Sequence, residues 1–511
     1  AARQHLPWSR GPLTRALAAL ITWAGIAVGH VPRDVREHLR YRPFRDFCSF
    51  NVAAERTAAL CFQRLVELVP GSATDLLRIA ADEERHRQVF ALIAGALAGD
   101  DRLAPEMDGA RLAAGIGAVG AHFLPRALRS GAVGGHPLGA GGPVWVEEDA
   151  GSAPCGREAL LARILEATGF PARLHALAAA AGRPLATLRV AIKPSFMLGY
   201  HRGDPSPLTD PALVRALVAW LRAQGCGPLV VIEGPTIYDH FFQRRSVPEV
   251  AAYFGLAAPE IEVVDAAQEQ VTHDYGRGLG QCSVARSWRD AEVRISFGKV
   301  RSHPIDQAML SLGNLEWLGA RCDEHLFLER QAQRQTATMM LIDAFPPHLA
   351  LLDAYAAVPD GVVGMMGTRR AHHPHRLYAG YDAIAVDLVA GRHLGLAQPL
   401  RSALMRAASH WFGLPAEAVA VIGVDRPIAG WRGPQADGWS SLLSLVAHPM
   451  YMLGSMRGAV FVPQMDVQAF PPRRPPGFGL RLRRRLVQRL LGLDLGLDAP
   501  RATAAPADGR S

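Results

Sequence analysis

Residues 208–235 read LTDPALVRALVAWLRAQGCGPLVVIEGP and contain a helix followed by a strand. Asp210 and Pro211 are typical of a helix start, because an aspartate side chain can cap the first turn and proline suits the first helical position. We therefore predict a helix over Pro211–Gln224. The short apolar run Leu229–Glu233 then predicts a buried strand.

The same alternation of strands and helices extends to both sides of this stretch. Further strands are predicted at Val144–Glu147, Leu188–Ile192, Ile261–Val264, Glu292–Phe297, Ala350–Ala356, Gly361–Met365 and Ala418–Ile422. Further helices are predicted at Arg157–Thr168, Val247–Phe254, Asp306–Leu318 and Ala383–Leu394. Apolar strands that alternate with helices indicate a parallel sheet covered on both faces. We expect one α/β parallel-sheet domain over residues 144–470.

The chain before residue 131 has a different character and predicts an all-α domain over residues 1–130. The candidate helices are Leu13–Val28, Arg45–Val69, Ser72–Ala98 and Gly109–Arg129. The apolar run Ala16–Val28 is shorter than the roughly 20 residues that a membrane span needs, so a buried helix is favoured over a signal or membrane segment. Residues 131–143 are glycine-rich and predict a linker.

From residue 471 the chain is rich in proline and arginine. Leu480–Leu493 has leucines at helical spacing among arginines and predicts a basic amphipathic helix. Such a helix can lie on an anionic membrane surface or pack against its own domain, and we favour packing. The last dozen residues are expected to be disordered.

Composition narrows the functional classes. Six cysteines are scattered over 511 residues without a C-x-x-C pair, so a zinc ribbon, a ferredoxin-type cluster and a disulfide scaffold are not expected. A reducing, cytoplasmic location is the simplest interpretation. The formal net charge is +8, but the sequence lacks the interleaved aromatic and basic residues that are typical of a nucleic-acid-binding surface. Nucleotide-binding motifs are also missing from the sequence.

The two helices Arg45–Val69 and Ser72–Ala98 carry a candidate metal site. They are joined at Pro70-Gly71, and Glu55 lies about as far from this turn as Glu83 and His86 do. Glu83 and His86 share a helix face because they are three residues apart. A carboxylate opposite a Glu-x-x-His pair is half of a di-iron carboxylate site.

Over about Arg45 to Ala98, this segment therefore resembles the ferritin-like family. The resemblance implies bound iron or manganese. A complete site needs a second set of ligands, and Gly109–Arg129 offers only His122, preceded by Glu106. Either the site is incomplete or two chains pair their hairpins as a homodimer. The alternative is that Glu55, Glu83 and His86 are solvated helix charges, since Glu83 lies in a charged run.

A second resemblance covers about Ala186 to Asp425. Its motifs are IKPS at 192–195, LTDP at 208–211, VIEGP at 231–235, ISFGK at 295–299, His303, Asn314, LD at 352–353, DGVVG at 360–364 and DAIAVD at 382–387. In order and spacing they resemble the uncharacterised family called domain of unknown function 362. The chain departs from that pattern at Gly313, where relatives have lysine, and at Gly367-Thr368, where they have Gly-Pro. Relatives often carry a cysteine-rich cluster module that this chain lacks.

Polar residues in these motifs follow the predicted strands. Ligands of open parallel sheets bind beyond the carboxyl ends of the strands, so we expect these side chains to converge on one edge. The candidate catalytic residues are Lys193, Glu233, Lys299 and His303, and the candidate substrate-binding residues are Asp210, Asn314, Asp353 and Asp382. Two lysines beside a helix N-terminus suit a small carboxylate or phosphate substrate. Asp210 and Asp382 can instead be helix caps, and Asp387 a surface charge.

The tract His372, His373, His375 with Tyr378 can bind metal, but a polar surface loop is favoured. Three functions remain open at this point. The first is a metal-dependent oxidoreductase acting on a small anionic substrate. The second is a non-redox isomerase or lyase that uses only the α/β cleft. The third is a dimeric binding or scaffold protein with a membrane- or partner-binding basic helix.

Overall fold

The structure is a computed structural model of the chain. It describes residues 70–97, 136–149, 155–236, 239–259, 261–275, 281–303, 307–318, 341–358, 371–396, 402–413, 419–431 and 464–473. It also describes single residues between 52 and 66, at 338, 339, 415 and 462, and between 478 and 486. Within these described parts, the structure contains no helix long and apolar enough to cross a membrane.

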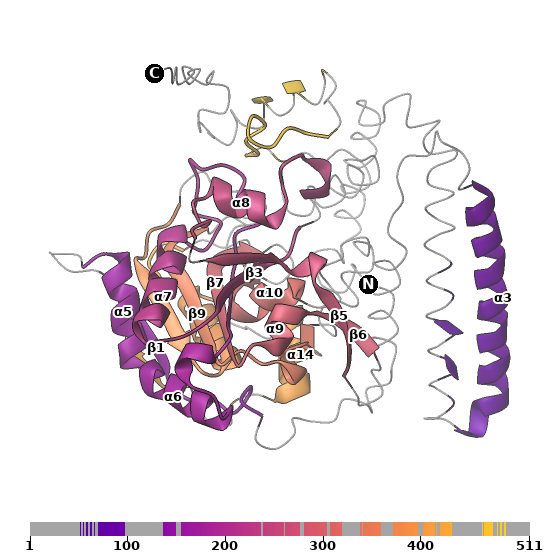
Figure 1. Ribbon diagram of the computed structural model, residues 1–511, viewed down its shortest axis with the longest axis horizontal. Coiled ribbons are helices and arrows are strands. Elements are labelled where there is room, and N and C mark those ends of the chain that lie inside the picture. Colours follow the sequence, from indigo (N-terminus) through magenta and orange to yellow (C-terminus); the bar gives the residue numbers. More distant parts are fainter. Residues whose placement is uncertain are drawn as a thin grey trace.

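A nine-stranded sheet forms the centre of the described α/β part (Figure 1). Its strands are β1 (Val144–Glu148), β2 (Val190–Pro194), β3 (Leu229–Glu233), β4 (Glu262–Asp265), β7 (Val293–His303), β8 (Gln307–Met309), β9 (Leu349–Val358), β10 (Arg376–Gly380) and β11 (Val421–Gly423). The order across the sheet is β11-β1-β10-β9-β7-β2-β3-β4, with β8 paired to β7. A separate antiparallel hairpin consists of β5 (Gln270–Asp274) and β6 (Gln281–Ala285).

The sheet is mixed, although most of its neighbouring strands are parallel. Strands β4, β3, β2, β7 and β9 run in one direction, and β1 and β11 share that direction. Strand β10 runs antiparallel between β1 and β9, and β8 runs antiparallel to β7. The predicted α/β class is confirmed, but the sheet is not parallel throughout, because β10 lies between β9 and β1 and runs antiparallel to both.

Helices cover both faces of this sheet, and α5 and α7 are visible in front of the strands in Figure 1. One face packs against α5 (Arg157–Ala167), α6 (Phe170–Ala180), α7 (Pro211–Ala223) and α8 (Val247–Tyr253). The other face packs against α9 (Arg286–Asp290), α10 (Ser311–Asn314), α13 (Ala383–His393) and α14 (Ala403–Phe412). Such two-sided cover explains why the strands read as continuous apolar runs.

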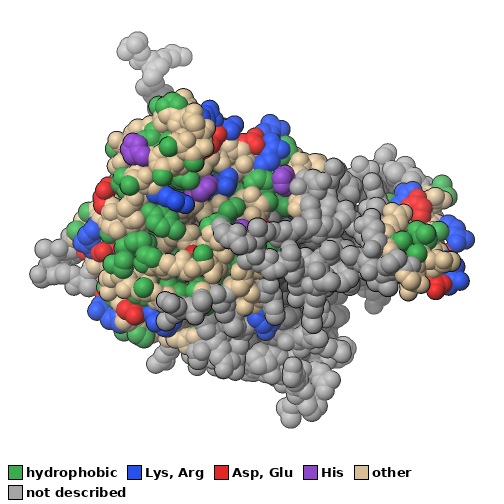
Figure 2. Space-filling model, turned by 90° about the horizontal axis from the view of Figure 1, so that it is seen from below, with side chains coloured by type: hydrophobic (Ala, Val, Ile, Leu, Met, Phe, Trp, Pro, Cys, Tyr) green, Lys and Arg blue, Asp and Glu red, His purple; other side chains and the backbone are tan. Residues whose placement is uncertain are grey.

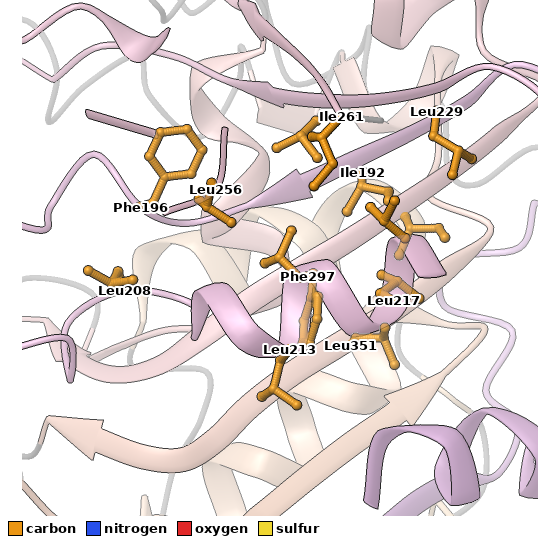
Figure 3. Close-up of a cluster of buried hydrophobic side chains, with 14 of the residues drawn as sticks. Ile192, Phe196, Leu208, Leu213, Leu217, Leu229, Leu256, Ile261, Phe297 and Leu351 are labelled. Carbon is orange, nitrogen blue, oxygen red and sulfur yellow. The ribbon is translucent and has the colours of Figure 1, made fainter. Parts of the chain in front are cut away.

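The core consists of two clusters of buried side chains, one on each face of the sheet. Alternate residues of a strand point to opposite faces, so Ile192 belongs to one cluster and Ala191 to the other. Figure 3 shows part of the first cluster, where Leu213 and Leu217 of α7 face Phe297 and Leu351 of the sheet. The sheet is therefore rigid and places the carboxyl ends of its strands in a fixed row.

Most of the predicted elements of the α/β part are present near their predicted positions. The helix predicted at Asp306–Leu318 is instead the strand β8, the short helix α10 and a 3-10 turn at Leu315–Trp317. The strand predicted at Gly361–Met365 lies outside the described residues. The structure adds α6, the β5–β6 hairpin and β10, none of which was predicted.

The helical hairpin is described only in part. A 3-10 turn at Pro70–Ser72 leads into α3 (Ala73–Leu97), and the described residues between 52 and 66 are helical. This agrees with the two predicted helices around Pro70-Gly71. The predicted helices Leu13–Val28 and Gly109–Arg129 lie outside the described residues. A ferritin-like bundle is thus not shown, and only its predicted central hairpin is partly described.

Candidate functional site

The hairpin brings Glu55, Glu83 and His86 together. One ligand atom from each lies within 4.8 Å of the other two. His86 Nδ1 is 3.4 Å from Glu83 Oε2 on the same helix and 3.9 Å from Glu55 Oε2 on the preceding helix. Residues on opposite sides of the turn thus meet, as their equal distance from it predicts.

The electrostatics of this group differ from those of an ordinary charged helix face. The Glu55 side chain is only 18% exposed, and burial followed by the neighbouring Glu83 raises the pKa of Glu55 to about 7. The other charges of the run pair among themselves, Arg85 with Asp82 and Arg87 with Glu84. Acidic and basic side chains accordingly lie next to one another on the right-hand lobe of Figure 2, which is the hairpin.

The chemistry of the three donors fits a transition metal. Two carboxylates and an imidazole suit iron, manganese or zinc better than calcium, which takes oxygen ligands only. A cation between Glu55 and Glu83 would offset the cost of placing two carboxylates side by side. Three protein ligands leave coordination positions open. The predicted contributors Glu106 and His122 lie outside the described residues.

At the carboxyl edge of the sheet, Lys193 and Glu233 form a buried ion pair. Lys193 Nζ contacts Glu233 Oε1 and donates hydrogen bonds to Pro194 O at 2.9 Å and to Asn314 Oδ1 at 3.3 Å. Glu233 accepts hydrogen bonds from the backbone N–H groups of Phe196 and Gly234. Burial lowers the pKa of Lys193, and the adjacent Glu233 opposes this effect.

Asn314 connects this pair to the neighbouring strand. Its Nδ2 donates to Lys193 O at 2.6 Å and to Ser296 Oγ at 3.1 Å. Asn314 belongs to the short helix α10, which packs directly on β7. The predicted residues Lys193, Glu233 and Asn314 therefore form one connected group. All three are buried, with at most 3% of each residue exposed.

A second buried pair joins Lys299 of β7 to Asp353 of β9. Lys299 Nζ is 2.8 Å from Asp353 Oδ2, and the same oxygen accepts a hydrogen bond from the Asp210 N–H at 2.9 Å. The Asp210 side chain caps α7 through the Ala212 N–H at 2.8 Å and pairs with Arg157. The predicted residues Lys299, Asp353 and Asp210 thus also form a connected group.

Of the remaining predicted site residues, Asp382 does not join these groups, and His303 is described only by its backbone. Asp382 caps α13 by accepting from the Ile384 N–H and also accepts from the Gly141 N–H, both at 2.9 Å. It follows the end of the antiparallel strand β10 and therefore lies at the amino edge of the parallel strands, opposite Lys299. His303 is the last residue of β7, paired with Gln307 of β8.

Asp387 is not the surface charge that the sequence allowed. It is buried and accepts hydrogen bonds from the N–H groups of Ser311 and Leu312 at 2.9 and 3.1 Å. Burial raises its pKa to about 7. The residue therefore holds α13 against α10.

More accessible polar groups surround the Lys299–Asp353 pair. Tyr355, two residues after Asp353, stacks on His375 with ring centroids 4.6 Å apart, and its hydroxyl donates to Asp149 Oδ2 at 3.3 Å. Arg157 lies over the Tyr355 ring at 5.1 Å. Burial, followed by the charges of His375, His372 and Lys299, lowers the pKa of His373.

We call Arg157, Tyr355, His373 and His375 the rim. Sequence reasoning missed it as a group, because the histidines were interpreted as a surface loop. The tract directly precedes the strand β10, but all five residues of that strand are buried, so no alternation could have marked it in the sequence. His375 also has a positive φ of 50°, which is uncommon for a residue other than glycine and is found preferentially at functional sites.

A hollow elsewhere on the surface carries no polar chemistry. It has a volume of about 360 Å³ and is lined by apolar residues of α8, β4 and their connection, namely Pro248, Ala257, Ala258, Pro259, Ile261 and Val263. None of the predicted site residues lines it. The buried ion pairs and the rim therefore remain the candidate chemistry of the α/β part.

The fold and these groups define an α/β domain with buried lysine–carboxylate pairs at the carboxyl edge of its sheet. Residues 190–392 match the family model described as Domain of unknown function (DUF362). The match begins with β2 and reaches α13, so it includes both ion pairs but neither β1 nor β11. Comparisons with curated proteins and with solved structures return no match.

Proposed function

We propose that the protein is a metal-dependent oxidoreductase that acts on a small anionic substrate. In this proposal the hairpin binds iron or manganese through Glu55, Glu83 and His86. The α/β part binds the substrate at the carboxyl edge of its sheet. The observation that carries the proposal is the approach of the three donor atoms to within 4.8 Å of one another.

The chain's own residues have distinct roles in the proposed metal site. Glu55 and Glu83 supply the negative charge that holds a cation, and the i, i+3 spacing of Glu83 and His86 fixes their mutual orientation. Beside them, Arg85 pairs with Asp82 and Arg87 pairs with Glu84, so these two arginines are engaged by other carboxylates of the helix. Once bound, iron or manganese supplies one-electron redox chemistry. A second copy of the hairpin would supply the remaining ligands in a homodimer.

In the proposed substrate site, the buried ion pairs do not themselves contact the substrate. Lys193 and Lys299 are each neutralised by a carboxylate, so neither presents an unpaired charge to an anion. Arg157 of the rim also pairs with Asp210, but unlike the two lysines it is exposed to solvent. We infer that the pairs fix the shape of the edge, while Arg157 and His373 contact a carboxylate or phosphate.

Metal binding by the full-length protein tests the proposal. The protein is loaded anaerobically with Fe(II) or with Mn(II), desalted and analysed for metal. The wild type is expected to retain metal, and E55A, E83A and H86A are expected to lose it, because each removes one of three ligands. D82A and E84A are matched controls, since each removes a carboxylate from the same helical turn without touching the ligand set.

Two results would overturn the metal proposal. One is a wild type that retains no metal above trace. The other is metal that survives in E83A and H86A as well as in the controls. Far-UV circular dichroism of every variant verifies that the helices have formed, so that loss of metal is attributed to loss of a ligand.

A second candidate function is a non-redox isomerase or lyase that uses only the carboxyl edge. It is favoured by the buried Lys299–Asp353 pair, because Asp353 accepts hydrogen bonds from the N–H groups of Asp210 and Tyr355 and is thereby connected to the ionisable groups of the rim. The two candidates differ in their dependence on the hairpin. Turnover that persists in H86A and is lost in H373Q supports the second candidate and rejects the first.

A further inference from the structure

An apolar stripe near the C-terminus is exposed. Phe478, Leu482 and Leu486 are each four residues apart and are helical in the structure, so they share one helix face. Their exposed fractions are 74%, 58% and 57%. The expectation that the helix Leu480–Leu493 packs its leucines against its own domain is therefore not met by Leu482 and Leu486. A stripe of large apolar groups on one helix face, when it is bordered by charged residues, is typical of a binding surface.

The charge around the stripe has one sign. Residues 467–493 contain seven arginines and no aspartate or glutamate. Arg481 and Arg485 belong to the same described helical turns and are exposed. A helix with an apolar stripe beside arginines complements a surface that is negatively charged outside and apolar just beneath, which is the structure of an anionic lipid leaflet.

The segment just before the stripe is fixed to the α/β domain. The Gln243 N–H donates to Pro471 O at 2.7 Å, and the Arg473 N–H donates to Phe241 O at 2.9 Å. Phe470 is buried, and its ring lies 4.7 Å from that of Tyr253 in α8. The stripe therefore begins only a few residues from a firm attachment point, and whatever binds it is held close to the domain.

We propose that the helix carrying Phe478, Leu482 and Leu486 docks the protein on an anionic lipid surface. The three side chains insert at the boundary between headgroups and acyl chains, and the arginines contact lipid phosphates. This association is independent of the metal chemistry proposed above. A lipid surface is favoured over nucleic acid, because phosphate contacts alone leave the apolar stripe without a function.

Vesicle co-sedimentation of the full-length protein tests this proposal. The probes are phosphatidylcholine vesicles with and without about one third phosphatidylserine. We expect the wild type to bind the anionic vesicles, and the triple variant F478S/L482S/L486S to bind roughly tenfold more weakly or worse. R481Q/R485Q is expected to reduce the preference for phosphatidylserine, and added salt is expected to reduce binding by the wild type.

The matched control is L77S/V89S/L92S. It removes three apolar side chains of α3, which are 51%, 53% and 76% exposed, from a helix whose arginines Arg78, Arg85 and Arg87 are paired with carboxylates. This variant is expected to bind like the wild type. Binding by F478S/L482S/L486S at the wild-type level would overturn the proposal. Failure of the wild type to bind anionic vesicles at low salt would also overturn it. In that case the apolar stripe would be tested for binding to an acidic protein partner.

Discussion

Lys193 and Lys299 are buried cations, each with one carboxylate partner. In the sequence they appear as two positive charges at strand ends, which suggested direct contact with an anion. In the structure, Glu233 neutralises the charge of Lys193 and Asp353 neutralises that of Lys299. The exposed residues at this edge are those of the rim, and they differ from the predicted site residues. A sequence can place a lysine at a strand end, but it cannot show which carboxylate from a distant strand approaches it.

The Lys193–Glu233 pair leads to a stability prediction. E233Q removes one charge and leaves Lys193 buried opposite a neutral amide, so the free energy of unfolding should fall by about 3–5 kcal/mol. Urea unfolding followed by tryptophan fluorescence measures this change. The double variant K193M/E233Q removes both charges and should recover much of the loss. If E233Q is as stable as the wild type, Lys193 is neutral in the folded protein and the pair is not ionic.

His348 predicts a dependence of stability on pH. Its Nδ1 accepts a hydrogen bond from the Arg294 N–H at 3.0 Å, and burial followed by Arg294 and Arg173 lowers its pKa to about 3. Between about pH 6.5 and pH 3 the unfolded chain therefore binds a proton that the folded protein does not. Through this group, stability should fall by up to about 1.4 kcal/mol for each pH unit below 6.5.

The comparison with H348N isolates this effect. Asparagine retains an acceptor for the Arg294 N–H but does not titrate. The difference in unfolding free energy between wild type and H348N should therefore change steadily as the pH is lowered through this window. Equal pH dependence in the two proteins would show that His348 is protonated in the folded state as readily as in the unfolded chain.

At the scale of elements, the helix starts could be predicted best. Asp210 caps α7, and Ser246 with Glu249 forms a capping box at α8. These signals are local, because the capping side chain and the backbone that it binds are neighbours in sequence. Strand β10 was missed for the opposite reason. Arg376 is buried there because Glu148 and His393, both distant in sequence, contact its guanidinium.

Asp382 provides a prediction at this scale. It caps α13 and also binds the Gly141 N–H, so D382A loses a cap and a contact between distant segments. We expect the free energy of unfolding to fall by about 1–3 kcal/mol. S402A is the matched control, because Ser402 caps α14 through the Met405 N–H. A D382A variant no less stable than S402A would contradict the contribution of the Gly141 contact.

At the scale of the whole molecule, the sequence predicted the α/β class but not the order of strands. Strand–helix alternation indicates a sheet covered on both faces, and the two core clusters agree with it. The position of β1 between β10 and β11 depends on contacts across more than 200 residues, which no local pattern contains. The approach of Glu55, Glu83 and His86 to one another could be predicted because a single turn separates them along the chain.

The location of β1 also has a consequence for biosynthesis. This strand is among the first parts of the sheet to leave the ribosome, yet its partners are residues 376–380 and 421–423. Until those residues emerge, the backbone groups of Val144–Glu148 have no sheet neighbour, and a nascent chain with an open strand is prone to aggregate. Co-translational folding of this protein should therefore be late and sensitive to chaperones, because the sheet cannot be completed until most of the polypeptide has been synthesised.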